Sequence, residues 1–457
     1  MHERKKVPVS RHCLSLLIGG LLFLACSPPG GEHQPNVILI SIDTIRPDHL
    51  SVSGYARPTS PFLDRLAARG WIFRKCSSTS SWTAPAMASL FTGLYPRSHG
   101  VRHGAVRQGT IVNQERLDDS FLTLAEALKA RGYATFGVST NGHVTSETGM
   151  AQGFDTFTSL WFADAAAAHR AALGLKDKIA ASRPYFFWIH YFDPHAPYLP
   201  REPWLSRYSP NPALAREWGG KDMRELRLER GEILRHPELV STLVDLYDAE
   251  INYTDGFLER LFNEVVALEN SLVIVTSDHG ESFGEHGDLG HGESLFEEEI
   301  AVPLIVVLPR GGRKGKTVES PVSLIDVFPT VLDFLGCPAP SRVEGRSLLP
   351  LLTAGTGGGE RPLITELDRA AVLTGVRSGR WKLVAKPRKT ESKWLLFDLA
   401  LDPGESANLA GKNPGVFRDL CDRLKSWESS TPEFQAAPAA MNRRPERIGD
   451  LKALGYL

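Results

Sequence analysis

Runs of apolar residues alternate with helical patterns along most of the chain. The clearest run covers residues 36–42 and ends at Asp43. Uninterrupted apolar runs of this length are typical of strands that are buried on both faces of a parallel sheet. Further runs of this kind occur at residues 134–139, 185–191, 272–277 and 303–308.

Helical patterns at residues 60–70, 120–131 and 243–268 separate these runs. Strands that alternate with helices predict a doubly wound, mostly parallel α/β sheet. Beyond a low-complexity loop at residues 354–359, the pattern changes to short strands and one helix, expected at residues 372–377, 381–385, 394–399 and 417–428. We therefore expect a large α/β domain over residues 36–353 and a smaller subdomain, with an antiparallel sheet and a helix, over residues 360–457.

The N-terminus is typical of an export signal. Basic residues precede an apolar run at residues 14–25, which is too short to cross a bilayer as a mature helix. Ala25 followed by Cys26 is typical of a bacterial lipoprotein processing site. We expect a signal peptide over residues 1–25, a tether over residues 26–35, and a periplasmic or cell-surface lipoprotein anchored in the membrane if Cys26 is acylated. A plain secretory signal with an incidental cysteine is the alternative.

The composition excludes several other classes of protein. The 457 residues are 42% hydrophobic and 23% charged, with 52 Lys and Arg against 53 Asp and Glu, which is ordinary for a globular chain. Beyond the N-terminus the basic residues are interleaved with acids, so nucleic acid is not an expected partner. The cysteines are too scattered for a disulfide framework or a zinc knuckle, and the core must hold the fold.

Polar residues follow four of the predicted strands. They are Asp43; Thr140 and Asn141; Asp193 and His195; and Asp278 and His279. Open α/β sheets bind their ligands at the carboxyl edge of the strands. A single Asp after a strand is often only a turn former, but four polar strand ends on one edge indicate a site.

The strongest of these signals is the segment Asp278-His279-Gly280, which opens a glycine-rich loop that reaches His291. A carboxylate and an imidazole side by side can bind one divalent cation, and the glycines let the loop fold around it. A polar surface loop is the alternative. Mixed oxygen and nitrogen ligands favour Zn²⁺ or Mn²⁺, with Ca²⁺ and Mg²⁺ as further candidates.

A second group of residues surrounds Thr83. Pro85 suits the first turn of a helix and Gly93 suits its end, which places Thr83 at a helix N-terminus. There the backbone N–H groups face an anionic ester, and a nearby metal would make the hydroxyl a nucleophile. The alternative is an ordinary threonine N-cap.

Motifs spread over residues 36–408 carry a resemblance to a known family. They are residues 36–43, 59–67, 90–96, 193–198, 278–280, 302–306, 326–330, 345–348 and 402–405. In these motifs the chain resembles the sulfatase family of the alkaline phosphatase superfamily. The resemblance implies an alkaline-phosphatase-like fold and a metal-dependent hydrolase or transferase of sulfate or phosphate esters. It also implies Asp43, Asp278 and His279 as metal ligands, with Thr83 at the nucleophile position.

The chain departs from the family within this pocket. The family has Cys or Ser where Thr83 stands, because that residue is oxidised to formylglycine, whereas a threonine would give a ketone. Met87 stands where the family has Arg, Asn141 where it has Lys, and Thr44 where it has a second Asp. A direct threonine nucleophile is similar instead to the phosphodiesterase and phosphotransferase branches of the superfamily.

We interpret the chain as a hydrolase or transferase of phosphate esters, and of diesters in particular, whose single negative charge needs few cationic groups. Thr83 is the expected nucleophile and a further metal ligand, and Asn141 is expected to hold a non-bridging oxygen. His195 or His291 would protonate the leaving group, with loop bracing as the alternative for each. Two other functions stay open: a sulfuric ester hydrolase without formylglycine, and a non-catalytic surface lipoprotein that binds a glycan or a partner.

Overall fold

The computed structural model describes residues 34–435 except 104–105, 109–110, 311–314, 356–358, 370–371 and 387–392, together with residues 438–441 and residue 453. The predicted signal peptide and Cys26 lie outside these residues. The boundaries of the two expected domains stay predictions. Among the described residues, no helix is both long enough and apolar enough to cross a membrane.

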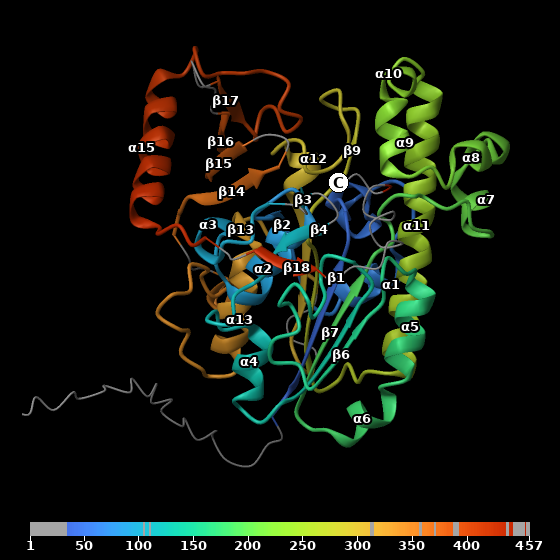
Figure 1. Cartoon of the computed structure of the whole chain (residues 1–457), viewed down its shortest axis with the longest axis vertical. Helices are drawn as coiled ribbons and strands as arrows, with labels where there is room; N and C mark the ends of the chain where they lie inside the picture. Colours follow the sequence, from blue (N-terminus) through green and yellow to red (C-terminus); the bar gives the residue numbers. More distant parts are fainter. Residues whose placement is uncertain are drawn as a thin grey trace, which may run out of the picture. The chain divides into compact units, whose positions relative to one another are not determined.

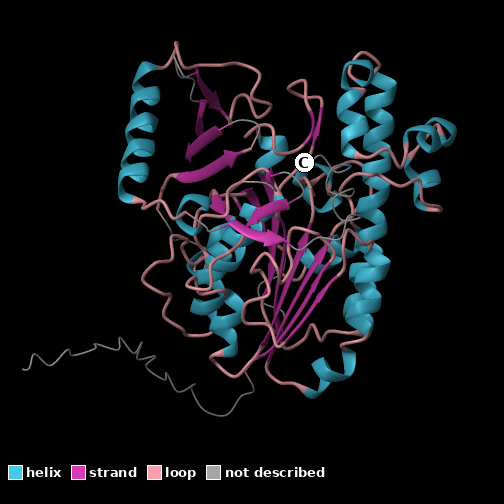
Figure 2. Cartoon of the chain, in the orientation of Figure 1, coloured by secondary structure: helices cyan, strands magenta, loops and turns pink. Residues whose placement is uncertain are grey.

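A nine-stranded sheet forms the centre of the described chain (Figure 2). Its strands lie in the order β12 (Lys316–Val318), β2 (Trp71–Ser77), β11 (Ala301–Val307), β8 (Ser271–Ser277), β1 (Asn36–Ile42), β7 (Tyr185–Tyr191), β5 (Ala134–Ser139) and β6 (Thr156–Ser159), with β13 (Val322–Ser323) beside β2. The strands from β8 to β6 are parallel, whereas β11 runs antiparallel to both β8 and β2. The predicted mostly parallel α/β sheet is confirmed.

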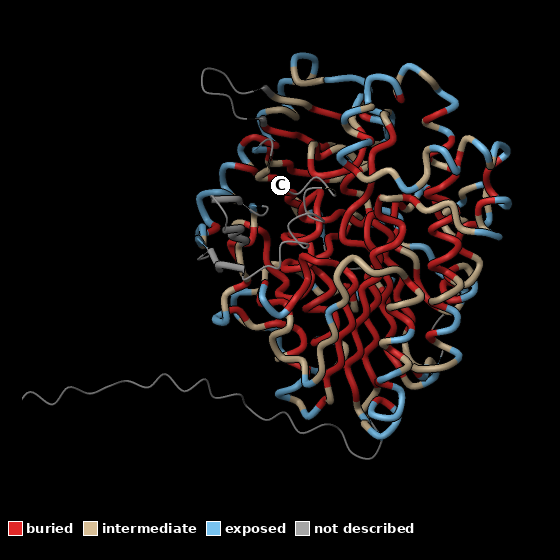
Figure 3. Tube along the Cα trace, turned by 45° about the vertical axis from the view of Figure 1, so that its right-hand side comes forward, coloured by how far each residue is buried: buried red, intermediate tan, exposed pale blue. Residues whose placement is uncertain are grey.

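Helices cover both faces of this sheet, and Figure 1 shows them in two layers. One layer contains α1 (Pro61–Ala67), α5 (Ala165–Leu173) and α11 (Pro237–Glu264), and the other contains α2 (Thr83–Thr92), α4 (Leu124–Lys129) and α13 (Val327–Phe334). Alternate residues of β1 face the two layers. Ile38 and Ile40 pack in the layer of α11, and Val37 and Leu39 pack in the layer of α2. The central strands are therefore buried from end to end (Figure 3).

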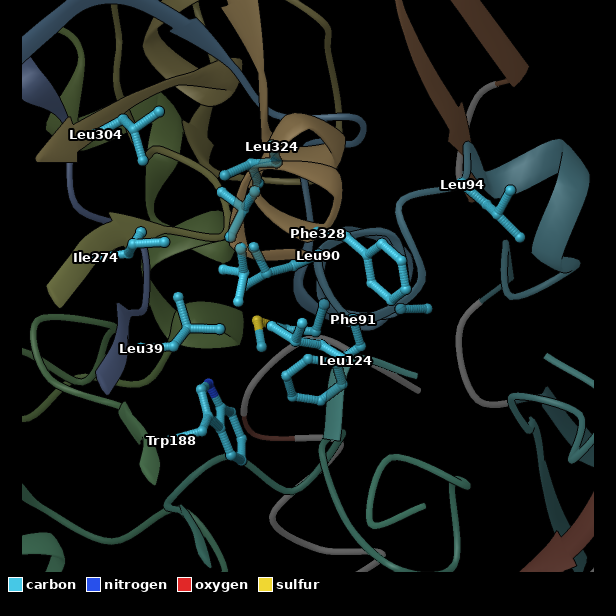
Figure 4. Packing of buried hydrophobic residues seen from close by; sticks show 14 of the residues in the cluster. Leu39, Leu90, Phe91, Leu94, Leu124, Trp188, Ile274, Leu304, Leu324 and Phe328 are labelled. Carbon is cyan, nitrogen blue, oxygen red and sulfur yellow. The ribbon is translucent and has the colours of Figure 1, made fainter. Parts of the chain in front are cut away.

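The layer around α2 is closely packed in Figure 4. Leu39, Trp188 and Ile274 project from the central strands toward Leu90 and Phe91 of α2. All five side chains are at most 2% exposed. This packing fixes the N-terminus of α2, and with it Thr83, against the carboxyl edge of the sheet.

Short helices are inserted between β7 and α11; the first two pack on α11, and the third packs on a hairpin near that edge. They are α7 (Trp204–Tyr208), α8 (Pro212–Trp218), α9 (Met223–Leu228) and α10 (Arg230–Ile233). The hairpin consists of β9 (Ser282–Phe283) and β10 (Leu289–Gly290). A β-carbon added at Gly290 would lie 2.5 Å from Met223 Sδ of α9, so helix and hairpin are in close contact.

The predicted C-terminal antiparallel sheet is also present. It has the order β14 (Leu363–Asp368), β15 (Val372–Ser378), β16 (Trp381–Lys386) and β17 (Lys393–Asp398), and α15 (Pro414–Ser430) packs on it. Lys382 of β16 is buried between Glu297 Oε1 at 2.9 Å and Glu405 Oε1 at 2.8 Å. Because Glu297 begins α12 (Glu297–Ile300), this ion pair ties the C-terminal sheet to the loop that follows His291.

The remaining elements are short. They are η1 (Pro47–His49), η2 (Ser51–Ser53), α3 (Pro96–His99), α6 (Lys176–Ala181), η3 (Leu324–Asp326) and α14 (Leu349–Thr353), and a three-stranded sheet of β3 (Val106–Gln108), β4 (Ile111–Glu115) and β18 (Pro438–Met441).

Candidate active site

The predicted metal ligands meet at the carboxyl edge of the parallel strands. Asp43 follows β1, and Asp278 and His279 follow the neighbouring strand β8. His279 Nε2 lies 3.4 Å from Asp43 Oδ1 and 3.3 Å from Asp278 Oδ2. All three side chains are fully buried. The parallel pairing of β1 and β8 thus brings together residues that are more than 230 positions apart in the sequence.

Thr83 lies against this cluster. It is the first residue of α2, directly after the N-cap position at Trp82, and its hydroxyl lies 3.2 Å from His279 Nε2. Asn141 donates from Nδ2 to Asp43 Oδ2 at 2.6 Å and to Thr83 Oγ1 at 3.4 Å. The Thr83 hydroxyl is therefore directed at the carboxylate–imidazole cluster, and Trp82 at the N-cap position makes no side-chain capping bond to α2.

A further histidine, His190, joins the cluster from within β7. Its Nε2 lies 3.4 Å from Asp43 Oδ2, and its Nδ1 lies 2.8 Å from Ser41 Oγ. Sequence reasoning missed this residue, because it looked only at positions after the strands. The available signal was an imidazole near the carboxyl end of a strand that is otherwise apolar or aromatic.

The cluster fits a divalent metal ion. Ligand atoms of Asp43, His190 and Asp278 all lie within 4.8 Å of one another. Asp43 Oδ1 and Asp278 Oδ2 are buried and meet no hydrogen-bond donor among the described residues, as expected of oxygens that bind a cation. His279 Nδ1 lies 2.9 Å from the carbonyl oxygen of Gly280 and donates to it, which leaves Nε2 as the ligand atom. Two carboxylates with imidazole nitrogens form a donor set suited to Zn²⁺ or Mn²⁺.

The pKa values of the two carboxylates shift in opposite directions. At Asp43, burial alone would raise the pKa, but the hydrogen bond from His190 and the charges of His195 and His279 outweigh it and lower the pKa to about 2. At Asp278, burial and the charge of Asp43 raise the pKa. Holding both groups ionised in one enclosed site therefore requires additional positive charge, which a bound cation would provide.

His195 and His291 lie together beside the cluster. Their ring centroids are 4.8 Å apart, and the His291 ring is 4.4 Å from that of His279. His195 Nδ1 donates to the carbonyl oxygen of Ala196 at 2.5 Å, and His291 Nδ1 lies 2.9 Å from Glu281 Oε1. The structure thus brings both predicted histidines to the cluster. Glu281, which holds His291, was not foreseen.

Burial controls the charge of these two histidines. It lowers the pKa of His195 to about 4, against the raising effect of the Asp43 charge. It also lowers the pKa of His291, and the positive charges of His279, His195, Arg227 and Arg369 lower it further. Both rings are therefore neutral at neutral pH until a negative group enters the site.

Two predicted strand-end residues do not join the cluster: Thr140, whose hydroxyl donates to the carbonyl oxygen of His190 at 2.9 Å, and Asp193. The Asp193 carboxylate accepts from the backbone N–H of Ala165 at 2.5 Å and from Arg201 Nη1 at 3.1 Å. Asp193 thereby binds the first residue of α5 and also Arg201, which precedes the inserted helices α7 to α10. Met87, which stands where the family has Arg, is fully buried in the apolar layer around α2.

The fold and the buried cluster together define an α/β ester hydrolase of the metal-dependent kind. The family model described as Sulfatase matches residues 35–337, and a second one, described as N-sulphoglucosamine sulphohydrolase, C-terminal, matches residues 284–429. The chain belongs to the sulfatase family, whose enzymes are metal-dependent. The expected enzyme class is confirmed.

Among curated proteins, the chain is similar to multifunctional alkaline phosphatase superfamily protein PehA of Trinickia caryophylli. The identity is 26%, over 90% of this chain and 99% of that protein. Arylsulfatase K of Rattus norvegicus is 24% identical over 90% of this chain and 83% of its own length.

Two solved structures share the fold. Phosphonate monoester hydrolase of Agrobacterium radiobacter has a TM-score of 0.68 and 24% identity over 90% of this chain and 100% of its own. A protein solved in complex with its substrate D-glucosamine-2-N,6-O-disulfate has a TM-score of 0.70 and 21% identity over 87% of this chain and 97% of its own. The fold is therefore shared by enzymes named for phosphorus esters and by one with a sulfated substrate.

Proposed function

We propose that this protein hydrolyses or transfers phosphate esters, with a preference for diesters, and that Thr83 is the nucleophile. The observation that carries the proposal is the position of the Thr83 hydroxyl, 3.2 Å from His279 Nε2 and 3.4 Å from Asn141 Nδ2 at the start of α2. A hydroxyl buried between candidate metal ligands, at the positive end of a helix dipole, is suited to attack an anionic ester.

The identity of residue 83 favours phosphorus over sulfur. Threonine carries a secondary alcohol, so the formylglycine aldehyde of ordinary sulfatases cannot form at this position. Direct attack by the hydroxyl is the simplest remaining use of the residue. A relative named for phosphonate monoester hydrolysis shares the fold, which supports phosphorus chemistry on this framework.

The proposed reaction is an in-line displacement at phosphorus. A divalent metal, if held by Asp43, Asp278 and the adjacent imidazoles, would supply positive charge to the phosphoryl oxygens and lower the pKa of the Thr83 hydroxyl. Thr83 Oγ1, having released its proton to solvent, forms a bond to phosphorus while the bond to the leaving alcohol oxygen breaks on the opposite side. Water then displaces Thr83 and releases a phosphate monoester from a diester substrate, or an acceptor alcohol displaces Thr83 and takes up the phosphoryl group as a new ester. Asn141 Nδ2, beside both Asp43 and Thr83, is placed to donate to a non-bridging oxygen.

His195 or His291 supplies the proton to the leaving oxygen. Nδ1 of each ring is engaged, by the Ala196 carbonyl and by Glu281, so Nε2 is the atom that exchanges a proton. The negative charge of the bound ester stabilises the imidazolium that burial otherwise disfavours. The same nitrogen then takes a proton from the attacking water. Of the two, His291 has the stronger support, because the Glu281 carboxylate faces its Nδ1.

The experiment compares Thr83→Ala and Thr83→Ser with Thr92→Ala, a control at the other end of the same helix. The Thr92 hydroxyl donates to the Ala88 carbonyl oxygen at 2.7 Å and accepts from the backbone N–H of Leu94 at 3.3 Å. Loss of a covalent nucleophile costs several orders of magnitude in turnover, so Thr83→Ala should be inactive while folded and metal-loaded. Thr83→Ser should retain part of the rate. Mass spectrometry after a quench with a slow phosphodiester should locate on Thr83 a phosphoryl group that still carries the remaining ester substituent. Near wild-type phosphodiesterase activity in Thr83→Ala would refute the proposal.

A sulfate ester hydrolase that works without formylglycine is a second candidate, favoured by the relatives named as sulfatases. Parallel assays with aryl sulfates, phosphate monoesters and phosphate diesters distinguish the two. A non-catalytic binding protein would turn over none of them. The joint presence of Thr83, Asp43, Asp278 and His279 in one buried cluster supports catalysis instead.

A further inference from the structure

Two imidazole groups flank the Asp43 carboxylate, one beside each of its oxygens. His279 Nε2 lies 3.4 Å from Oδ1, and His190 Nε2 lies 3.4 Å from Oδ2. Both nitrogens are close enough to Asp43 to reach a cation bound there. Whether each of them binds the cation or donates a hydrogen bond depends on which nitrogen of its ring carries the proton.

The partners of Ser41 decide this point for His190. Ser41 of β1 is paired with His190 of β7, and both side chains are fully buried, as is that of Trp188. Trp188 Nε1, which can only donate, donates to Ser41 Oγ at 3.1 Å, and Ser41 Oγ lies 2.8 Å from His190 Nδ1. The Ser41 hydroxyl therefore accepts from Trp188 and donates its own hydrogen to His190 Nδ1. The proton of the neutral His190 ring is then on Nε2.

The opposite tautomer would leave two buried polar groups without a partner. A proton on His190 Nδ1 would point at Ser41 Oγ, and the Ser41 hydroxyl hydrogen would then have no acceptor among the described residues. The lone pair on His190 Nε2 would face the lone pairs of Asp43 Oδ2. Buried polar groups are rarely left unpaired in this way, so the hydrogen-bond network selects the tautomer with the proton on Nε2.

His279 has the other tautomer. Its Nδ1 donates to the carbonyl oxygen of Gly280 at 2.9 Å, so its Nε2 carries a lone pair. That lone pair is close to Asp43 Oδ1 and Asp278 Oδ2. A cation at these atoms can bind His279, whereas His190 presents an N–H group that cannot bind a cation.

Asn141 provides a second donor to the same oxygen of Asp43. Its Oδ1 accepts from the backbone N–H of His143 at 2.7 Å, which fixes the amide so that Nδ2 donates to Asp43 Oδ2 at 2.6 Å. Asp43 Oδ2 thus accepts from both Asn141 and His190, whereas Asp43 Oδ1 meets no donor among the described residues. The carboxylate is held with one oxygen directed toward His279 and Asp278.

We infer that His190 is a positioning residue of the metal site and not a metal ligand: its Nε2–H group, oriented by Ser41 and Trp188, binds Asp43 Oδ2 and leaves Asp43 Oδ1 for the metal. The inference deepens the metal site on which the proposed function rests. Groups that bind a metal ligand from behind fix its orientation, and their loss lowers metal affinity about 10- to 100-fold.

The test uses the full chain loaded with one equivalent of Zn²⁺. His190→Phe keeps a flat ring without the N–H group, and His190→Gln keeps an N–H donor near the position of Nε2. His169→Phe is the matched control, because His169 is equally buried but lies on α5, where its Nε2 is 3.1 Å from Glu264 Oε2. Competition with a chelator measures zinc affinity, X-ray absorption counts the imidazole ligands of zinc, and nitrogen-15 NMR shows which nitrogen of His190 carries the proton.

His190→Phe should raise the dissociation constant for Zn²⁺ about 10- to 100-fold, and His190→Gln should restore part of the affinity. His169→Phe should bind zinc as the wild type does. The number of imidazole ligands should be the same in wild type and His190→Gln, and NMR of the wild type should find the His190 proton on Nε2.

Wild-type zinc affinity in a folded His190→Phe protein would overturn the inference. Equal losses of affinity in the Phe and Gln variants would also overturn it, since the N–H group would then make no difference. One imidazole ligand fewer in His190→Gln would make His190 a metal ligand, and a proton on Nδ1 would refute the hydrogen-bond network. These last two measurements decide the matter even where His190→Phe does not fold.

The same measurements separate this inference from the proposed function, because none of them uses a substrate. A protein with the expected zinc affinities and the expected His190 tautomer that turns over no phosphate ester would refute only the proposed function. Phosphodiester turnover that depends on Thr83, in a protein whose His190 binds zinc directly, would refute only the role of His190.

Discussion

Glu299 provides a direct test of how the loop after His291 is held in place. The side chain belongs to α12 and is fully buried. Its Oε1 accepts from Ser294 Oγ at 2.6 Å, and its Oε2 accepts from the backbone N–H groups of Glu293 and Ser294 at 3.2 Å each. Burial raises the pKa of Glu299 from 4.5 to about 8, although these donors oppose the rise. The carboxyl group is therefore protonated in the folded protein at neutral pH.

The sign of the resulting pH dependence follows from proton binding. Between pH 4.5 and 8 the folded state retains a proton at Glu299 that the unfolded state has released. Because the unfolded state binds fewer protons, the free energy of unfolding falls as the pH rises through this range. The contribution is complete below pH 4.5 and is lost above pH 8. Each pH unit corresponds to about 1.4 kcal/mol, so the loss amounts to at most about 5 kcal/mol.

The variant Glu299→Gln removes the titration and preserves the hydrogen bonds. Its amide oxygen can accept from the two backbone N–H groups, and its amide nitrogen can donate to Ser294 Oγ, which is able to accept. We expect the free energy of unfolding of this variant, measured in urea at pH 5, 6, 7 and 8, to fall less steeply with pH than that of the wild type. The difference between the two proteins should favour the variant increasingly toward pH 8.

The control is Glu428→Gln on the exposed side of α15, which should follow the wild-type slope. Parallel pH profiles of wild type and Glu299→Gln would show that Glu299 is already ionised when folded, and the argument from burial would fail. A variant that is equally destabilised at every pH would instead mean that the amide cannot replace the carboxyl group in this turn.

Two further predictions concern the metal and the N-terminus. Asp278→Ala and His279→Ala should each lower the metal content measured by elemental analysis, since a rigid strand end offers no replacement ligand. The control variant His103→Ala, at a half-exposed residue, should keep the wild-type metal content. Full metal occupancy in both site variants would reject the assignment. If Cys26 is acylated, wild-type protein should partition with membranes and Cys26→Ser should be released, because several acyl chains anchor firmly where one binds only marginally. Equal partitioning of the two forms would indicate a simple secreted protein.

The central strands could be predicted because their burial on two faces leaves a plain signal in the sequence. β1, β5 and β7 have the predicted bounds, since none of them must expose a polar side chain to water. β2 was missed because Arg74 and Lys75 interrupt its apolar pattern, and both are exposed near the edge of the sheet. The antiparallel direction of β11 was also not apparent, because the strand is as apolar as its parallel neighbours.

The residues of the candidate site fall into two groups. Some could be predicted because they follow strands, and the positions of the others depend on tertiary packing. Asp43, Asn141, Asp278 and His279 follow strands whose parallel pairing carries them to one edge, so their meeting could be inferred from a sheet alone. The position of the C-terminal sheet depends instead on contacts between distant segments: the backbone N–H of Glu366 donates to the Thr79 carbonyl oxygen at 2.8 Å, and Lys382 lies between Glu297 and Glu405. No local pattern encodes these contacts. The loop that carries His291 is thus held partly by contacts between residues far apart in the sequence, and such contacts leave no periodic signal from which a sequence pattern could predict them.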